Sequence, residues 1–550
     1  MKIAIAQVNP TVGDLKGNRG LVEEAARRAE SAGAGLVVLP EMVLTGYPPM
    51  DLLEREGFVE DQLRELEALE AASHGVSIVL GAVLPWEQGR PKQLANAAVL
   101  LANGKRVATR AKSLLPSYDV FDERRYFVRA EKREPVRISV GAETRSVGLA
   151  VCEDTWVSRI AYDVNPVHEL VRDGAELILN PSASPWHVGK ARARQDMLAE
   201  LARASRTPVV FVNQVGGNDE LVFDGGSFAC DADGRVVAQL PLFESAFTVV
   251  DLPEPAGTGD AHTCAPMERA AELEAGLALG IRDYFEKQNL PPGAVIGLSG
   301  GIDSAVTAHL AVEALGADRV LGIAMPGPFS SRHSVDDAHA LGELLGIEVR
   351  EVDITPVFES YRSIFAALFG DKDDYGLTQQ NIQSRIRGAV LMAASNQEGR
   401  LVLATGNKSE LSVGYCTLYG DTVGGLAVLG DVYKHDVYAI AHHANRAMPR
   451  IPENTIAKPP SAELAPDQLD TDDLPDYDVL DSILEQCIEG GVGSAGIKPP
   501  PGCTPQVAAG IVHRLDRNEY KRRQAPMVLR TTPKAFGSGR RLPIVHRYRS

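Results

Sequence analysis

Short apolar runs alternate with helical patterns along almost the whole sequence. In the first half the runs include KIAIAQV, GLVVLPE, VSIVLGAVL, VGLAVCED, AELILNPS and PVVFVNQ, and segments such as LVEEAARRAESA have the apolar spacing of a helix. A chain with this alternation buries its strands beneath helices, so the sequence predicts layered α/β domains. With 550 residues, the chain is too long for a single small module.

One break interrupts this alternation. In DLPEPAGTGDAHTCAP the periodicity vanishes and Pro, Gly and small polar residues accumulate, which predicts a linker at 251–267 between domains at 1–250 and 268–550. After the break, a helical pattern leads to the run AVIGLS and then to alternating units at RVLGIAM, IEVREV and RLVLAT. The second half is therefore predicted to be a doubly wound parallel sheet, with loops at 370–380 and 463–481.

Charge and cysteine usage exclude several classes of protein. Lys and Arg number 56 against 73 Asp and Glu, a net charge of −17, so no basic field attracts nucleic acid. No apolar run approaches the roughly 18 residues of a membrane span, and the strand-like start MKIAIAQVNP does not resemble a secretory signal. Six scattered cysteines without a CxxC pair argue against a zinc site or a disulfide framework. We expect a cytoplasmic protein that binds neither nucleic acid nor membranes.

Three reactive side chains stand out in the first half, and two of them, Cys152 and Glu41, lie where a strand is expected to end. Cys152 comes after VGLAV, Glu41 lies in LPEMVLTGYPP, and Lys112 begins KSLLPSYDVFDERRYF. A cysteine in such a position is by itself more typical of a small buried apolar residue. Together, a carboxylate can take the thiol proton, an amine can stabilise an oxyanion, and a thiolate can form a covalent acyl intermediate.

The motifs LPE, KxxLPxYxVFDExRYF, CED and NPSASPWHVGK resemble those of the nitrilase-superfamily amidases in order and spacing. The resemblance implies an αββα sandwich with Glu41 as general base, Lys112 as oxyanion stabiliser and Cys152 as nucleophile. It also implies an amide-binding set consisting of Tyr118, Glu153, Ser184 and Lys190. For Tyr47 and Glu123, a role in the site and a purely structural role both remain open. The segment NQVGGNDELVFDGGSF is assigned to the scaffold because its glycines suggest tight turns.

A glycine-rich loop marks the second half. The run AVIGL leads through SGGIDS into the helix-like TAHLAVEAL, so glycines, hydroxyls and a helix N-terminus converge where an anion could bind. A plain tight turn is the alternative, and the Walker sequence GxxxxGK[ST] is absent. SGGIDS resembles the pyrophosphate loop of the N-type ATP pyrophosphatases. That resemblance implies ATP binding with Mg²⁺ held by Asp303 and Glu410.

Further segments resemble NAD synthetases, namely SSRHSVDDAHALGELLGI, QQNIQSRIRG, ATGNKSELSVGYCTLYGDTVGGLAVLGDVYK, KPPSAELAPDQ and NEYKRRQAP. Together with a nitrilase-type half, they are typical of the glutamine-dependent members of that family. The implied ATP contacts are Gly297, Leu298, Ser299, Gly300, Gly301, Ile302, Asp303, Ser304, Met325, Thr405 and Lys434. The implied deamido-NAD contacts are Asn381, Glu410, Asp421 and Lys521. The sequence departs from the family pattern at Gln380 and Ser117, where glutamate and asparagine are common.

The resemblance implies a two-part reaction. One half would release ammonia from glutamine, and the other would use ATP and Mg²⁺ to convert deamido-NAD into NAD, with release of AMP and diphosphate. Ammonia is expected to pass through a shielded tunnel, and a homo-oligomer is expected. Two alternatives stay open: an ATP-pyrophosphatase amidotransferase for another acceptor, and an amidase with a noncatalytic nucleotide-sensing module.

Overall fold

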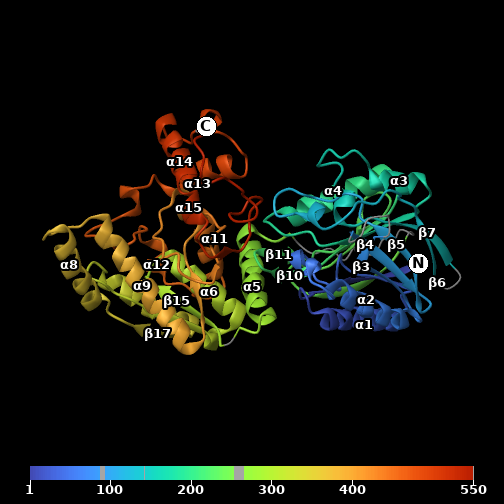
Figure 1. The fold of residues 1–550 in the computed structure, drawn as a ribbon, viewed down its shortest axis with the longest axis horizontal. Coiled ribbons are helices and arrows are strands. Elements are labelled where there is room, and N and C mark those ends of the chain that lie inside the picture. Colours follow the sequence, from blue (N-terminus) through green and yellow to red (C-terminus); the bar gives the residue numbers. More distant parts are fainter. Residues whose placement is uncertain (87–92, 141–142, 253–265, 291, 549–550) are drawn as a thin grey trace. The chain divides into compact units, whose positions relative to one another are not determined.

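The computed structural model describes residues 1–86, 93–140, 143–252, 266–290 and 292–548 (Figure 1). The chain forms two compact units, Met1–Met267 and Glu268–Ser550. The linker predicted at 251–267 lies for the most part outside the described residues. Within the described ranges, no helix is both long enough and apolar enough to cross a membrane.

The first unit contains two six-stranded sheets. Across the first sheet the order is β14 (Ala246–Asp251), β1 (Lys2–Gln7), β2 (Leu36–Val38), β3 (Ser77–Pro85), β4 (Leu94–Ala102) and β5 (Lys105–Ala111). Across the second sheet the order is β13 (Val236–Gln239), β12 (Phe228–Cys230), β9 (Val209–Asn213), β8 (Leu177–Ser182), β7 (Glu143–Leu149) and β6 (Val136–Val140).

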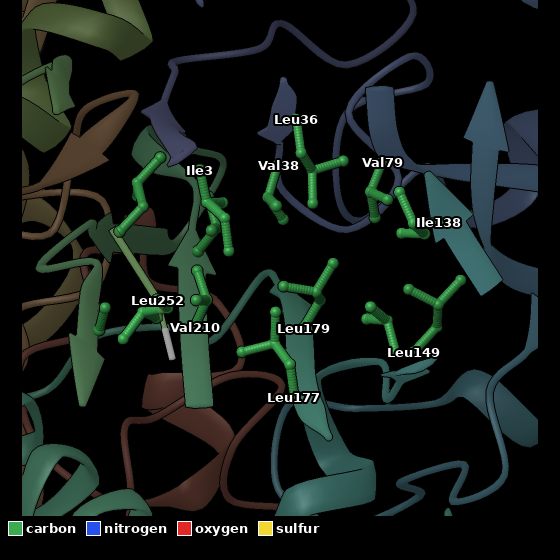
Figure 2. Packing of buried hydrophobic residues seen from close by; sticks show 14 of the residues in the cluster. Ile3, Leu36, Val38, Val79, Ile138, Leu149, Leu177, Leu179, Val210 and Leu252 are labelled. Carbon is green, nitrogen blue, oxygen red and sulfur yellow. The ribbon is translucent and has the colours of Figure 1, made fainter. Parts of the chain in front are cut away.

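The two sheets of this unit pack face to face. Figure 2 shows their shared core, in which Ile3, Val38 and Val79 of the first sheet face Leu179 and Val210 of the second. Helices α1 (Leu15–Ser31) and α2 (Phe58–Glu70) cover the outer face of the first sheet, and α3 (Pro166–Arg172) and α4 (Lys190–Ser205) cover that of the second. The central strands, such as β3, β8 and β9, are buried on both faces, which explains their continuous apolar runs. The predicted αββα sandwich is confirmed.

The second unit is built on one parallel sheet. Its strand order is β17 (Glu348–Glu351), β16 (Val320–Ala324), β15 (Ala294–Leu298), β18 (Leu401–Ala404), β19 (Leu426–Ala427) and β20 (Met527–Val528). Each neighbouring pair runs parallel. Chain order reverses direction at β15, and in open α/β sheets ligands bind beyond the carboxyl ends of the strands at such a point. The predicted doubly wound sheet is confirmed.

Helices cover both faces of this sheet. On one face α8 (Thr355–Phe369) and α9 (Leu377–Glu398) contribute Phe358, Ile386 and Leu391 to the core. On the other face α6 (Ile302–Leu315) packs on the strands, with α5 (Arg269–Lys287) and α11 (Lys434–Ala444) against it. The remaining helices are α7 (Arg332–Leu345), α10 (Lys408–Val413), α12 (Glu453–Ala457), α13 (Tyr477–Ile488), α14 (Pro505–Arg517) and α15 (Glu519–Arg522).

Two predicted loops are partly helical. The loop predicted at 370–380 is wrong for its last four residues, because α9 begins at Leu377. The loop predicted at 463–481 is wrong for its last five residues, because α13 begins at Tyr477, and it also contains a short 3₁₀ helix, Asp470–Asp472. The polar start of α9 and the acidic residues before α13 hide the apolar spacing that appears only further along each helix. The segment assigned to the scaffold forms a hairpin of β10 (Val215–Asn218) and β11 (Leu221–Asp224).

Candidate functional site

Cys152 lies in a sharp turn after β7. It begins the short 3₁₀ helix Cys152–Thr155, and its φ of +41° is in the left-handed region that non-glycine residues rarely adopt. The side chain is 4% exposed. Strained turns of this kind are found at functional sites, where the surrounding structure holds them in place.

Lys112 forms ion pairs with two carboxylates in the interior of the first unit. It follows β5, and its Nζ lies 2.8 Å from Glu41 Oε1 and 2.7 Å from Glu123 Oε1. Tyr47 donates its hydroxyl proton to Glu123 Oε1 at 3.0 Å, and Asn96 donates to Glu41 Oε1 at 2.6 Å. All five side chains are buried. The structure therefore brings Glu41, Lys112, Glu123 and Tyr47 together, and the position of Glu123 favours a role in the site over packing alone.

Electrostatics give these groups distinct protonation states. Burial raises the pKa of the Cys152 thiol well above its usual range, and Glu41 adds to this while Lys112 opposes it. Burial lowers the pKa of Lys112, but Glu123 and Glu41 outweigh burial and raise it well above its usual range. Burial raises the pKa of Glu123 to about 7, with Lys112 opposing the rise. The resting thiol is thus protonated, and it needs a neighbouring base before it can act as a nucleophile.

Asp154 ties the lysine segment to the cysteine segment. Its Oδ1 accepts hydrogen bonds from the backbone N–H of Ser113 at 2.9 Å and of Leu114 at 2.8 Å. Its Oδ2 accepts one from the N–H of Val151 at 3.0 Å. These residues adjoin Lys112 and Cys152, so one buried carboxylate fixes the spacing of the two reactive groups.

Of the residues predicted to bind the amide substrate, Tyr118 and Glu153 contact each other, whereas Ser184 and Lys190 are held by other partners. Tyr118 donates to Glu153 Oε1 at 2.9 Å, which places this pair directly beside Cys152. Ser184 is held by its backbone N–H, which donates to Asn213 Oδ1 at 2.8 Å. Lys190 starts α4, where its Nζ donates to Pro185 O at 2.6 Å and lies 5.6 Å from the centre of the Trp156 ring.

The glycine-rich loop of the second unit lies at the carboxyl end of β15. Gly300 has a φ of +75°, and a Cβ there would lie 2.4 Å from Ser334 O, so only glycine fits. Ser304 Oγ donates to Gly301 O at 2.9 Å and accepts from the Ser299 N–H at 3.3 Å. No side chain caps the first turn of α6, so its backbone N–H groups are left for an anion.

Asp303 and Glu410 share one ammonium group. Lys434 Nζ lies 2.6 Å from Asp303 Oδ2 and 3.1 Å from Glu410 Oε1. Asn407 donates to Asp303 Oδ1 at 2.8 Å. Burial raises the pKa of Glu410 to about 8, with Lys434 opposing the rise and Asp303 adding to it. Burial lowers the pKa of Lys434, but Asp303 and Glu410 outweigh burial and raise it, so the ammonium stays charged between them.

A cavity of about 280 Å³ opens at this edge of the sheet. Of the residues predicted to bind ATP or deamido-NAD, those that line it are Gly297, Leu298, Ser299, Gly301, Ile302, Asp303, Met325, Thr405, Glu410, Asp421 and Lys434. Gly300, Ser304, Asn381 and Lys521 are not among the residues that line it. Gly300 and Ser304 instead shape the loop whose neighbours face the cavity.

Asn381, Asp421 and Lys521 gather around one short segment beside the cavity. Asn381 Oδ1 accepts from the hydroxyl of Thr417 at 2.9 Å, and Asp421 Oδ1 accepts from the Thr417 N–H at 2.6 Å. Lys521 Nζ donates to the backbone oxygens of Gly414 and Cys416, each at 2.7 Å. Of the three, Asp421 lines the cavity, while the other two support the segment next to it.

Several residues of both sites were not predicted from the sequence. Asn96 is a polar residue inside an apolar run, a signal that could have identified it. Tyr162 donates to Glu153 Oε1 at 2.5 Å, but its segment has no periodicity or motif. Asp470 lines the cavity and accepts from Tyr477, whose ring lies 4.9 Å from Lys434 Nζ; both were hidden in the acidic run.

Each half of the chain matches the model of a known family. Residues 2–257 match the family model of carbon-nitrogen hydrolases, and residues 274–525 match that of NAD synthase. The glutamine-dependent NAD(+) synthetase of Synechocystis is 43% identical over 557 residues, covering 99% of this chain and 99% of that protein. The enzyme of the same name from Thermotoga maritima is 39% identical and covers 100% of this chain and 99% of its own.

A solved structure shows the same likeness. It is the glutamine-dependent NAD+ synthetase from Acinetobacter baumannii in complex with ADP, which matches with a TM-score of 0.76 and 37% identity. The match covers 99% of this chain and 98% of that chain. It therefore includes both units.

Proposed function

The chain belongs to the glutamine-dependent NAD(+) synthetases, which are glutamine-hydrolysing ligases, and from this premise we propose which residues carry each half of the reaction. Residues 1–250 release ammonia from glutamine. Residues 268–550 use ATP to convert deamido-NAD into NAD, AMP and diphosphate. The observation that supports this division best is that each unit has its own buried lysine held between two carboxylates.

In the first unit, Cys152 attacks the side-chain amide carbon of glutamine. Glu41 takes the thiol proton as the S–C bond forms, and the Lys112 ammonium stabilises the negative charge that develops on the amide oxygen. Glu41 then gives the proton to the departing nitrogen, so ammonia leaves and a thioester remains. Water, deprotonated by Glu41, attacks the thioester; the C–S bond breaks, glutamate is released, and Glu41 returns the proton to the Cys152 thiolate.

The amide-binding residues would hold the rest of the glutamine molecule. Glu153 carries the opposite charge to the α-ammonium group, and Lys190 the opposite charge to the α-carboxylate. Ser184 immediately follows Ala183, whose N–H donates to Glu41 Oε2 at 2.9 Å. Ser184 is therefore fixed next to the general base.

In the second unit, the nicotinate carboxylate of deamido-NAD attacks the α-phosphorus of ATP and diphosphate leaves. Ammonia then attacks the carbonyl carbon of the resulting acyl adenylate, AMP leaves, and the attacking nitrogen loses its extra proton. The Ser299–Ser304 loop and the first turn of α6 offer hydroxyl and backbone N–H donors to the phosphates. Lys434 balances negative charge, and Asp421 lies on the cavity wall where deamido-NAD is proposed to bind.

Asp303 and Glu410 fit a divalent metal ion. Both line the cavity and present hard oxygen donors around a shared ammonium group. In the described part of the chain, no group of three or more His, Cys, Asp or Glu side chains could hold a metal ion. This suits Mg²⁺, which takes one or two carboxylates and completes its shell with water and substrate phosphates. When bound, it neutralises phosphate charge. Passage of ammonia through a tunnel, a homo-oligomeric state and a cytoplasmic location stay predictions.

The test compares two nitrogen donors. We expect wild type to form NAD from deamido-NAD, ATP and Mg²⁺ with either glutamine or ammonium. Cys152→Ala should lose the reaction with glutamine and keep the reaction with ammonium, because it removes only the nucleophile that releases ammonia. Cys230→Ala is the matched control, since Cys230 is also a buried free thiol. If Cys152→Ala still used glutamine, the nucleophile would be wrong; if wild type made no NAD with either donor, the acceptor would be wrong.

A further inference from the structure

Glu153 differs from Glu41, Glu123 and Asp224, the buried carboxylates of the first unit that are paired with a Lys or Arg. Its side chain is 3% exposed, yet no Lys, Arg or His forms an ion pair with it among the residues that the structure describes. Instead, two phenols donate to the same oxygen, Oε1: Tyr118 at 2.9 Å and Tyr162 at 2.5 Å. Burying a carboxylate without a cation is costly, so this site favours a positively charged ligand.

The two phenols fix the orientation of the carboxylate. Burial and the neighbouring Glu153 raise the pKa of both Tyr118 and Tyr162, so both hydroxyls remain donors. An oxygen that accepts two hydrogen bonds uses both of its lone pairs. Within the described residues, no hydrogen bond reaches the other oxygen, Oε2. Glu153 therefore presents one occupied oxygen and one open oxygen, directly after the nucleophile Cys152.

We propose that Tyr162 is a positioning residue that, with Tyr118, holds Glu153 so that its open oxygen receives the α-ammonium group of glutamine. This inference rests on the proposed glutamine hydrolysis and deepens it. Tyr162 comes from the segment between the Cys152 turn and α3, whereas Tyr118 comes from the loop after Lys112. Both segments donate to the same oxygen of Glu153, so selection of the substrate depends on both.

This arrangement explains how glutamine would be distinguished from simpler amides. An amide without the α-ammonium group leaves the open carboxylate oxygen desolvated and without a partner. A site built to bind a polar group rejects analogues that lack it, because the buried protein group then loses water and gains nothing. Tyr162 should therefore affect the binding of glutamine and have little effect on the breaking of the amide bond.

The experiment measures glutamate release by the full-length enzyme and uses 5-amino-5-oxopentanoate, which is glutamine without its α-amino group. We expect Tyr162→Phe to raise the KM for glutamine roughly tenfold, because one hydrogen bond to a charged group is lost. The kcat should be preserved. The inhibition constant of the analogue should stay unchanged, so the preference for glutamine over the analogue narrows.

Two further variants separate this role from a general loss of structure. Tyr126→Phe is the matched control, because Tyr126 also donates to a carboxylate, Asp51 Oδ1, at 2.6 Å, but does not contact Glu153. In a Glu153→Gln background, Tyr162→Phe should add no further loss, since the two residues act through one contact.

Each outcome decides the proposal. It is overturned if Tyr162→Phe leaves the KM for glutamine unchanged, or weakens glutamine and the analogue equally, or adds a full further loss in the Glu153→Gln background. It is supported if glutamine binding alone weakens. Failure of the proposed function would look different, because wild type itself would release no glutamate from glutamine.

Discussion

Replacing Lys112 with methionine tests the electrostatic design of the first unit. The substitution Lys112→Met keeps a long side chain but removes the ammonium group that lies 2.8 Å from Glu41 and 2.7 Å from Glu123. Both carboxylates are buried, and the hydrogen bonds from Tyr47 and Asn96 remain. The variant therefore leaves two close carboxylates without a cation.

The structure sets the size of the effect. An ammonium and a carboxylate with charge centres about 4 Å apart attract by about 4 kcal/mol at an effective dielectric constant near 20. Part of this is offset because the variant no longer has to desolvate the ammonium, and removing one partner of a buried ion pair costs about 3–5 kcal/mol. We expect the free energy of unfolding of the first unit to fall by about 3–5 kcal/mol at pH 8.

The loss should depend on pH. The pKa of Glu123 is already raised to about 7 from its ordinary 4.5, and without Lys112 it rises further. A carboxyl whose pKa is raised by folding binds more protons in the folded state, so stability falls as pH rises from its unfolded to its folded pKa. Between pH 6 and pH 8 the variant should therefore lose about 1 kcal/mol more than wild type does.

Tryptophan fluorescence in urea measures this loss. All three tryptophans, Trp86, Trp156 and Trp186, lie in the first unit, so their emission reports its unfolding alone. The unfolding midpoint is measured at pH 6 and pH 8 for wild type and Lys112→Met. The control is Lys105→Met, which removes a lysine from an exposed position of β5.

The rate of NAD formation is the second measurement on Lys112→Met. Glutamine-driven NAD formation should be lost, because the oxyanion is no longer stabilised, while ammonium-driven formation is kept. The reasoning is refuted if the midpoint at pH 8 matches wild type, if the deficit is larger at pH 6 than at pH 8, or if glutamine is still used at the wild-type rate.

Two further variants test local geometry. Gly300→Ala should raise the KM for ATP in the ammonium-driven reaction, because the new Cβ would lie 2.4 Å from a backbone oxygen of α7. The control is Gly316→Ala, because Gly316 has a similar φ, +85°, but no neighbour within 4 Å of the new Cβ. An equal KM for ATP in the two variants would contradict this prediction. Arg194→Met should lower the unfolding free energy of the first unit by about 3–5 kcal/mol, since its buried partner Asp224, 3.0 Å away, is left unpaired. The exposed Arg192→Met should change the tryptophan midpoint little, and similar shifts for the two arginines would count against the argument.

The two layered folds could be predicted because their central strands are buried on both faces. A strand such as β3, which is buried along almost its whole length, requires a continuous run of apolar residues. The starts of α9 and α13 could not be predicted, because their first turns carry polar or acidic side chains and pack on little. The spacing of apolar residues in a sequence indicates which positions are buried, and these first turns are only partly buried.

Some residues of the two sites could likewise be predicted from the sequence, and others could not. Glu41, Lys112 and Cys152 each follow a strand, and order along the chain together with a motif was enough to indicate them. The motif could not show that Asn381 and Lys521 lie beside the cavity and do not line it, since sequence spacing does not separate contact from support. Tyr162 had no signal at all, because its importance comes from meeting Tyr118 at a shared oxygen across a distance of 44 positions in the chain.

The hydrogen bonds of Asp154 also bear on how such an enzyme can change over evolutionary time. They couple the segments of Lys112 and Cys152 into one rigid piece, so the bond-breaking groups keep their spacing when outer segments vary. The segment at 157–165, which includes Tyr162, takes no part in these hydrogen bonds, so substitutions there can alter the contact with Glu153 while Lys112 and Cys152 keep their spacing. Mutation can therefore explore new nitrogen donors there while the inherited chemistry is preserved, which makes this segment the natural target for directed evolution of donor choice.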